Sequence, residues 1–158
     1  MQPRLNYLHL APEAYKLMIA MEEYLHHTSI PQPLLNLVKL RASQVNGCAY
    51  CIDMHWKDLR ATGETEMRLY GLDAWRESPY YTEKERAALE WTESVTLIKE
   101  THAGDGAFAA LRAHFTDKEI VDLSFAIATI NSWNRLAIGF RATPGQYRSP
   151  LNAQPQTM

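Results

Sequence analysis

The stretch NGCAYCIDMH, residues 46–55, contains the side chains of this sequence that are best suited to catalyse a reaction. Cys48 and Cys51 are three positions apart, His55 follows four positions later, and the chain has no other cysteine. On a helix beginning near Cys48 the three side chains share one face. Helical residues three apart have α-carbons separated by roughly 5 Å, which a disulfide tolerates. The spacing therefore predicts a reversible dithiol with a histidine beside it.

The two thiols are expected to have different roles. The N-terminus of a helix favours the thiolate form of Cys48. His55 lies one turn beyond Cys51 and can take the proton from that thiol near neutral pH. We therefore predict that Cys51 is the attacking thiol and Cys48 the resolving thiol.

Two other interpretations of this stretch remain open. Free cysteines are often buried, so the pair could simply fill the core. A zinc site needs four ligands, whereas only Cys48, Cys51 and His55 cluster here, so we expect no metal. The remaining histidines have no motif around them and are expected at the surface or at helix caps: His9, His26, His27, His102 and His114.

The composition indicates one domain of ordinary size that is neither nucleic-acid-binding nor membrane-bound. The chain has 158 residues, 46% of them hydrophobic, and a formal net charge of -2. It has no block of basic residues to track phosphates and no apolar run long enough to span a bilayer. With both cysteines in one motif rather than spread over loops, a reducing, cytoplasmic location is expected.

The hydrophobic periodicity predicts an all-α fold of about seven helices, with no strand alternation. Pro12 and Pro33 suit first turns, Gly47 suits a helix end, and Thr82 with Glu85 forms a predicted capping box, as does Thr116 with Glu119. The expected long helices include residues 33–44, 48–60, 64–77, 82–100 and 116–140, with a loop and a short helix before the last. No glycine-rich phosphate loop is found, so no nucleotide cofactor is expected.

The segment 119–140 is apolar on most faces, which predicts a helix surrounded by protein, either within the subunit or at an interface. Asn131, Asn134 and Arg135 place polar groups in this apolar stretch. They are expected to satisfy helix ends or a subunit interface, or to support the thiols. We predict a single domain over residues 1–140 and an extended tail over 141–158.

The stretch LVKLRASQVNGCAYCIDMHWKDLRATGETEMRLYGLDAW, residues 37–75, resembles the alkylhydroperoxidase D-like (AhpD-like) branch of the carboxymuconolactone decarboxylase family. The later AIATINSWNRLAIGF resembles the closing helix of that branch. The resemblance implies an AhpD-like helical fold assembled into trimers or hexamers. It also implies a peroxidase or disulfide-reductase activity in which Cys51 attacks the peroxide, Cys48 completes the disulfide and His55 relays protons.

One position departs from the motif of that branch. The motif has a glutamate twelve residues before the first cysteine, and this position is Asn36 here. An amide can orient an imidazole or a water but cannot exchange a proton as a carboxylate does. Asn36 and Asn134 are therefore expected only to support the site, and Asp53, Glu22 and Glu23 are poor substitutes on spacing.

The leading hypothesis is a cofactor-free peroxidase that reduces hydroperoxides and is reset by an external dithiol, such as a thioredoxin-like or lipoyl protein. A second is a cofactor-free decarboxylase like the namesake of the family. A third is an oligomeric redox sensor with weak activity, because the relay glutamate is Asn36.

Overall fold

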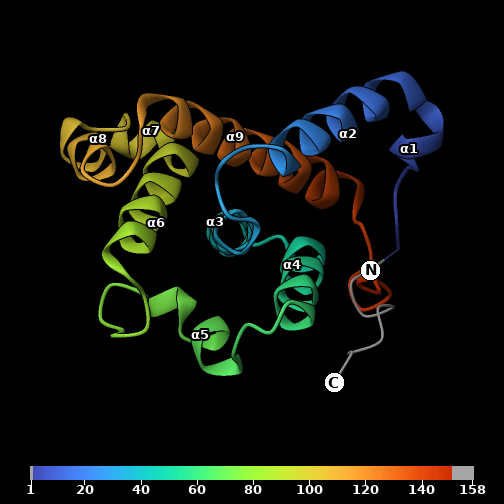
Figure 1. The fold of residues 1–158 in the computed structure, drawn as a ribbon. Helices are drawn as coiled ribbons and strands as arrows, with labels where there is room; N and C mark the ends of the chain where they lie inside the picture. Colours follow the sequence, from blue (N-terminus) through green and yellow to red (C-terminus); the bar gives the residue numbers. More distant parts are fainter. Residues whose placement is uncertain (1, 151–158) are drawn as a thin grey trace.

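A central helix organises the fold. The computed structural model describes residues 2–150, and within them it is all-helical, without strands, which confirms the predicted class. Helix α3 (Gln32–Asn46) packs against α4 (Ala49–Ala61), α6 (Glu83–Thr96) and α9 (Asp117–Phe140). Figure 1 looks almost along α3 and shows these helices around it.

Helix α3 is central because apolar residues occupy almost all of its faces. Leu35 and Val38 belong to a hydrophobic cluster shared with α2, α6, α8 and α9. Leu37 and Leu40 belong to a second cluster, formed with α4, α5 and α6. A helix buried on opposite faces must be covered on both, so the other helices pack around it.

Helix α2 and several short helices complete the described chain. Their bounds are α1 (Tyr7–Leu10), α2 (Pro12–His26), α5 (Glu66–Tyr70), the 3₁₀ turn η1 (Leu72–Ala74), α7 (Ile98–Thr101) and α8 (Asp105–Arg112). The predicted helix over 64–77 is divided into α5 and η1, and that over 82–100 into α6 and α7. At the first break, a side chain on Gly71 would meet the Met67 carbonyl oxygen at 3.0 Å. The close approach of backbone at this turn was not visible in the periodicity.

Both predicted capping boxes are present. Thr82 accepts the backbone N–H of Glu85 at 3.3 Å, and the Glu85 side chain accepts the backbone N–H of Thr82. Thr116 and Glu119 make the same reciprocal pair at the start of α9. These bonds satisfy amides that have no partner within the helix and so fix where α6 and α9 begin.

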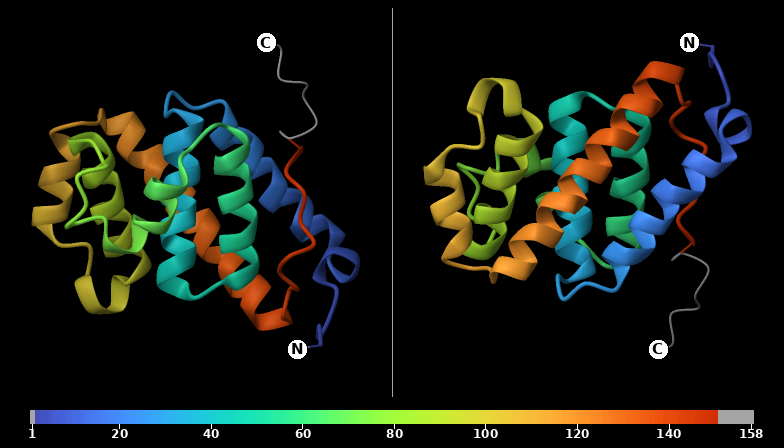
Figure 2. Two further views of the ribbon diagram at one scale, coloured as in Figure 1. Left: turned by 90° about the horizontal axis from the view of Figure 1, so that it is seen from below. Right: turned by 90° about the horizontal axis from the view of Figure 1, so that it is seen from above.

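Helix α9 crosses the molecule diagonally beside α2, and the chain then returns along α4 (Figure 2). One face of α9 is buried, whereas Val121 and Phe125 are about half exposed. Residues 141–150, which we call the strap, contain no α-helix. Residues 151–158 of the predicted tail lie outside the described residues, and the domain division stays a prediction.

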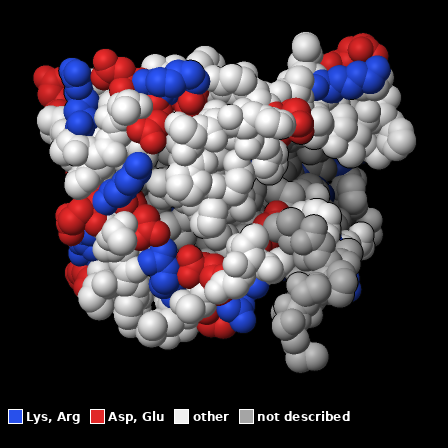
Figure 3. All heavy atoms as spheres, viewed as in Figure 1, with Lys and Arg blue, Asp and Glu red and all other residues white. Residues whose placement is uncertain are grey.

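Charged side chains of both signs are interspersed at the edges of the face seen in Figure 3, around a largely uncharged centre. In the described part of the chain, no helix is sufficiently long and apolar to cross a membrane.

The requirement for glycine in the left-handed turn before Cys48 can be tested by substitution. Gly47 has φ +69°, and a Cβ there would meet no atom within 4 Å. The cost of Gly47→Ala is therefore conformational, and we expect the free energy of unfolding to fall by about 1–2 kcal/mol in urea denaturation. Gly106→Ala, in α8 and equally free of contacts, is the control and should be neutral or slightly stabilising. Equal effects of the two substitutions would contradict this account.

Candidate functional site

The two cysteines form a disulfide at the start of α4. Their α-carbons are 5.4 Å apart, as the helical spacing predicted. Helix α4 begins at Ala49, one residue later than expected, and Cys48 is its N-cap residue with an extended backbone. Cys48 Sγ accepts the backbone N–H of Cys51 at 3.3 Å. The disulfide therefore closes the first turn of α4 without interrupting the helix.

The left-handed turn at Gly47 places Cys48 at this N-terminus. The backbone N–H of Cys48 donates to the carbonyl of Ser43 at 2.9 Å, and that of Gly47 donates to the carbonyl of Gln44. These bonds satisfy the last carbonyls of α3 in the manner of a glycine C-cap. The same turn therefore ends α3 and positions the first residue of α4.

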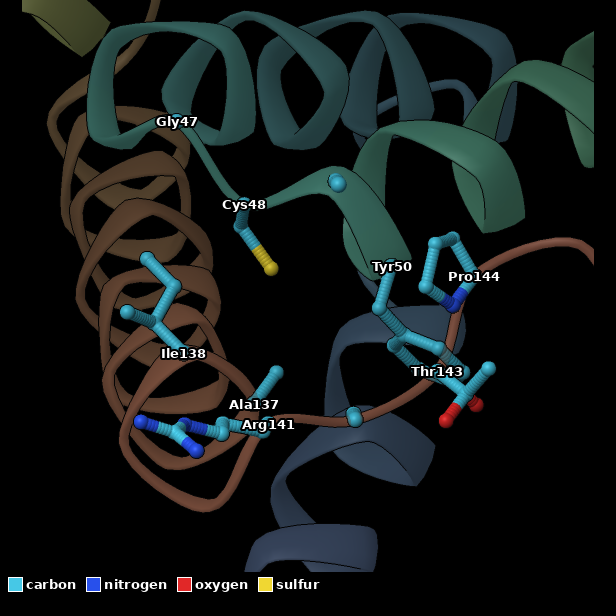
Figure 4. A pocket seen from close by; sticks show the side chains of 10 residues that line it. Gly47, Cys48, Tyr50, Ala137, Ile138, Arg141, Thr143 and Pro144 are labelled. Carbon is cyan, nitrogen blue, oxygen red and sulfur yellow. The ribbon is translucent and has the colours of Figure 1, made fainter. Parts of the chain in front are cut away.

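A pocket of about 520 Å³ opens at the disulfide. Figure 4 shows the Cys48 sulfur inside it, with Tyr50 and Pro144 on one side and Ile138 and Arg141 on the other. Cys51 and His55 do not line this pocket. Both cysteines are almost fully buried, at 1% and 2% exposure, and Cys48 is the one of the two that lines the pocket.

His55 is buried on the same face of α4 as Cys51, one turn further along. Neither ring nitrogen has a hydrogen-bond partner among the described residues. Desolvation lowers the pKa of His55 to about 3, and the positive charge of Lys39 acts in the same direction. At pH 7 the ring is neutral, and its lone pair is available to accept a proton. Unpaired buried polar groups cost stability, which favours a functional reason for retaining this histidine.

Lys39 is the charged group that sequence reasoning missed near His55. It lies on α3, is 5% exposed, and its Nζ donates to Glu22 Oε2 of α2 at 2.5 Å. The other oxygen of Glu22 accepts the indole N–H of Trp133 at 2.9 Å. Spacing gave no reason to place Glu22 near the site. The packing nevertheless pairs it with Lys39, whose positive charge acts on His55.

Asn36 and Asn134 do not touch the sulfurs through any hydrogen bond. Asn36 is half-buried on α3, one turn before Lys39, and no hydrogen bond joins it to His55. Asn134 is fully buried on α9; its Nδ2 donates to Ser43 Oγ at 3.0 Å. The predicted roles of Cys48, Cys51 and His55, with Asn36 and Asn134 beside them, stay predictions.

An amide network holds the residue two positions before Cys48. Asn46 Nδ2 donates to Asn134 Oδ1 at 2.8 Å and to Asn131 Oδ1 at 2.9 Å. Asn131 in turn donates to Thr96 Oγ1 of α6 at 3.0 Å, and Arg135 donates to Asn131 Oδ1. The polar residues of α9 therefore hold the last residue of α3 through contacts within the subunit.

The strap covers the outer face of α4 near the disulfide. The backbone N–H of Gly145 donates to Asp53 Oδ2 at 3.0 Å, Lys57 Nζ donates to the carbonyl of Tyr147 at 3.1 Å, and the Tyr147 hydroxyl donates to Asp58 at 2.9 Å. Asp53 thus points away from Cys51, as its spacing predicted. Within residues 2–150 no three His, Cys, Asp or Glu side chains form a group that could hold a metal ion.

Comparison with known proteins agrees with this fold and motif. The carboxymuconolactone decarboxylase family matches residues 12–94, more than half of the chain. The chain belongs to that family, and within it to the AhpD-like proteins.

Two relatives are similar over almost their full lengths. The uncharacterised protein YdfG of Bacillus subtilis is 46% identical over 138 residues, which are 87% of this chain and 94% of YdfG. The structure of ATU0492 from Agrobacterium tumefaciens, a protein of unknown function with a suggested AhpD role in antioxidant defence, is 48% identical. It has a TM-score of 0.89 and is matched over 92% of this chain and 100% of its own.

More distant structures share only the fold. A variant of the debrominase Bmp8, in complex with 2,3,4-tribromopyrrole, has a TM-score of 0.77 at 17% identity. The match covers 88% of this chain and 74% of that one. The fold alone therefore does not choose the reaction.

The lowered pKa of His55 predicts a loss of stability in acid. Between pH 6.5 and 3 the unfolded chain binds a proton at this histidine and the folded chain does not, so the free energy of unfolding falls as pH falls. The contribution is about 1.4 kcal/mol per pH unit, or about 2 kcal/mol between pH 6.5 and 5. Urea unfolding of the oxidised protein at the two pH values should show this loss. His55→Leu should remove it, whereas the exposed His114→Leu should retain it. Equal pH dependence of wild type and His55→Leu would refute the assignment.

The amide network predicts a second effect on stability. Asn134→Leu leaves Asn46 and Ser43 each without one partner in a buried region. We expect the free energy of unfolding to fall by about 1–3 kcal/mol. Ser132→Ala, on the exposed side of the same helix, is the control and should change it by less than about 0.5 kcal/mol. Thermal or urea unfolding measures both, and a neutral Asn134→Leu would show that the network does not hold the turn.

Proposed function

We propose that this protein is a thiol-dependent peroxidase, a disulfide oxidoreductase of the alkylhydroperoxidase D type. The proposal is carried by the Cys48–Cys51 disulfide with the buried, neutral His55 on the same helix face. Membership of the family and the 48% identity to ATU0492 support it. Hydroperoxides are the proposed substrates, and the cycle needs neither flavin nor metal.

In the oxidative step the Cys51 thiolate attacks one oxygen of the O–O bond. A sulfur–oxygen bond forms, the O–O bond breaks, and the alkoxide leaves as the alcohol after taking a proton. The Cys48 thiolate then attacks the sulfenic sulfur and expels hydroxide as water. The product is the disulfide, whose sulfurs need little movement because the helix already holds the α-carbons 5.4 Å apart.

His55 is proposed to accept the Cys51 proton and return it to the leaving oxygen. The pKa of about 3 belongs to the form with the disulfide, in which no negative charge faces the ring. In the reduced protein a thiolate at Cys51 would raise the pKa of the imidazolium by direct attraction. The amide of Asn36 cannot share this proton, and Glu22 is engaged by Lys39 and Trp133.

An external dithiol, a thioredoxin-like or lipoyl protein, is proposed to reset the enzyme. Assembly into a trimer or hexamer is also proposed. It is supported by large apolar side chains left exposed on α2 and α9, among them Leu17, Val121 and Phe125. A cytoplasmic location stays an expectation.

The test is a thiol titration of the reduced protein before and after one equivalent of tert-butyl hydroperoxide. Wild type should lose both thiols rapidly to an intramolecular disulfide. Cys48→Ser should stop at a sulfenic acid on Cys51, trapped by dimedone and located by mass spectrometry, and Cys51→Ser should not react. If His55 acts as the base, His55→Leu should slow the reaction by about 10²-fold.

The same experiment separates the alternatives. Undiminished peroxide consumption by Cys51→Ser would overturn the assignment of the attacking thiol. Slow reaction of both thiols in wild type would overturn the peroxidase. Turnover of a lactone by a cysteine-free variant would then support a decarboxylase, and a redox-dependent change of oligomer size would support a sensor.

A further inference from the structure

Of the two cysteines, Cys48 is the one that lines the pocket at the disulfide (Figure 4). Cys51 is not among the lining residues. A disulfide is the oxidised form of the site, and its reaction partner is a thiol rather than a peroxide. The pocket beside the oxidised cysteine pair is therefore relevant to the reductive half of the cycle. Its volume of about 520 Å³ is in the range of small-molecule sites.

The lining of the pocket suggests what it accepts. Ala137, Ile138, Ala142 and Pro144 provide an apolar wall, which suits a short hydrocarbon stem. Arg141 lies at the edge (Figure 4) and is the one cationic side chain of the lining. A ligand that fits both features is apolar along its length and negatively charged at one end.

Arg141 differs from the other arginines between residues 2 and 150. Each of the others has an ion pair or hydrogen bond from its guanidinium to a described residue. No such bond is made by Arg141, although it is only partly exposed. It is the C-cap of α9 with φ +59°, a left-handed conformation that is uncommon for residues with a side chain. A fork of donors beside an apolar pocket, with no partner among the described residues, suits a carboxylate.

We infer that this pocket admits the reducing thiol to Cys48, and that Arg141 selects thiols that carry a carboxylate. The inference rests on the proposed redox cycle of the disulfide. It adds small dithiols with a free carboxylate to the reductants proposed above, because a lipoyl group on a protein is amide-linked and offers no carboxylate to Arg141. The ligand thiolate attacks Cys48 Sγ, a bond forms between these two sulfurs, and the Cys48–Cys51 bond breaks. The electron pair leaves on Cys51 Sγ, which takes a proton. A second thiol of the ligand then attacks the mixed disulfide and releases Cys48 as the thiolate, so that the ligand leaves oxidised by two electrons.

The test compares two dithiols, dihydrolipoate and dihydrolipoamide, which share their thiols and apolar stem and differ only in the charge at the far end. Second-order rate constants for reduction of the disulfide are measured without peroxide, by acid quenching, alkylation and mass spectrometry. Wild type should react about three- to tenfold faster with the carboxylate, the size expected for one partly exposed charge-assisted contact. Higher salt should reduce this preference.

Arg141→Asn should bring the ratio of the two rate constants to about one, and Arg141→Lys should retain part of the preference. Asparagine is chosen because it tolerates the left-handed conformation at this position. The control is Arg112→Asn, which removes the same charge from an exposed site on α8 and should keep the wild-type ratio. Circular dichroism confirms that each variant is folded.

The outcomes distinguish this inference from the proposed function. An unchanged ratio in Arg141→Asn, or no preference in wild type, would overturn the selection of carboxylates by Arg141. A protein that shows the Arg141-dependent preference but does not react with hydroperoxide would overturn the peroxidase and leave the thiol site in place.

Discussion

Gly47 turns the chain from the central helix α3 into α4 through a left-handed conformation, and both cysteines take their positions from this turn. Because the turn is tight, Cys48 becomes the N-cap of α4 and Cys51 lies in its first turn. Asn46, just before the glycine, is held by amides of α9, so the end of α3 cannot shift without breaking these partly buried hydrogen bonds. The local geometry of the disulfide is therefore supported by the packing of the whole subunit.

The same packing sets the electrostatics around the dithiol. His55 is taken out of water without a hydrogen bond from any described residue, and Lys39, whose charge acts on it, is buried with Glu22 as its counter-ion. In a region of low dielectric, both effects favour the neutral imidazole. The chain thus keeps a proton acceptor uncharged beside the disulfide, at a cost in stability that the remaining core offsets. Glu22 stabilises this arrangement from α2, far away in sequence.

Sequence patterns predicted those features that depend on neighbouring residues. The capping boxes at Thr82 and Thr116, the glycine end of α3 and the disulfide spacing each involve groups only a few positions apart, and each was found. The helices predicted over 64–77 and 82–100 were too long, since each is divided into two shorter elements in the structure. At Gly71 the break follows the close approach of backbone and of the Tyr80 ring, which no helical periodicity records.

The sequence by itself determined that this is an all-helical chain with one C-x-x-C-x-x-x-H motif. Helix periodicity, helix caps and the spacing of the cysteines and histidine are all local properties of the chain. Only the tertiary structure decided the surroundings of that motif. It decided that Cys48 rather than Cys51 lines a pocket, that Lys39, paired with Glu22, acts on His55, and that Arg141, without a partner among residues 2–150, stands at the pocket edge. These contacts and electrostatic interactions join residues up to about a hundred positions apart. Their energies depend on burial and on distance, which are set only when the helices pack together.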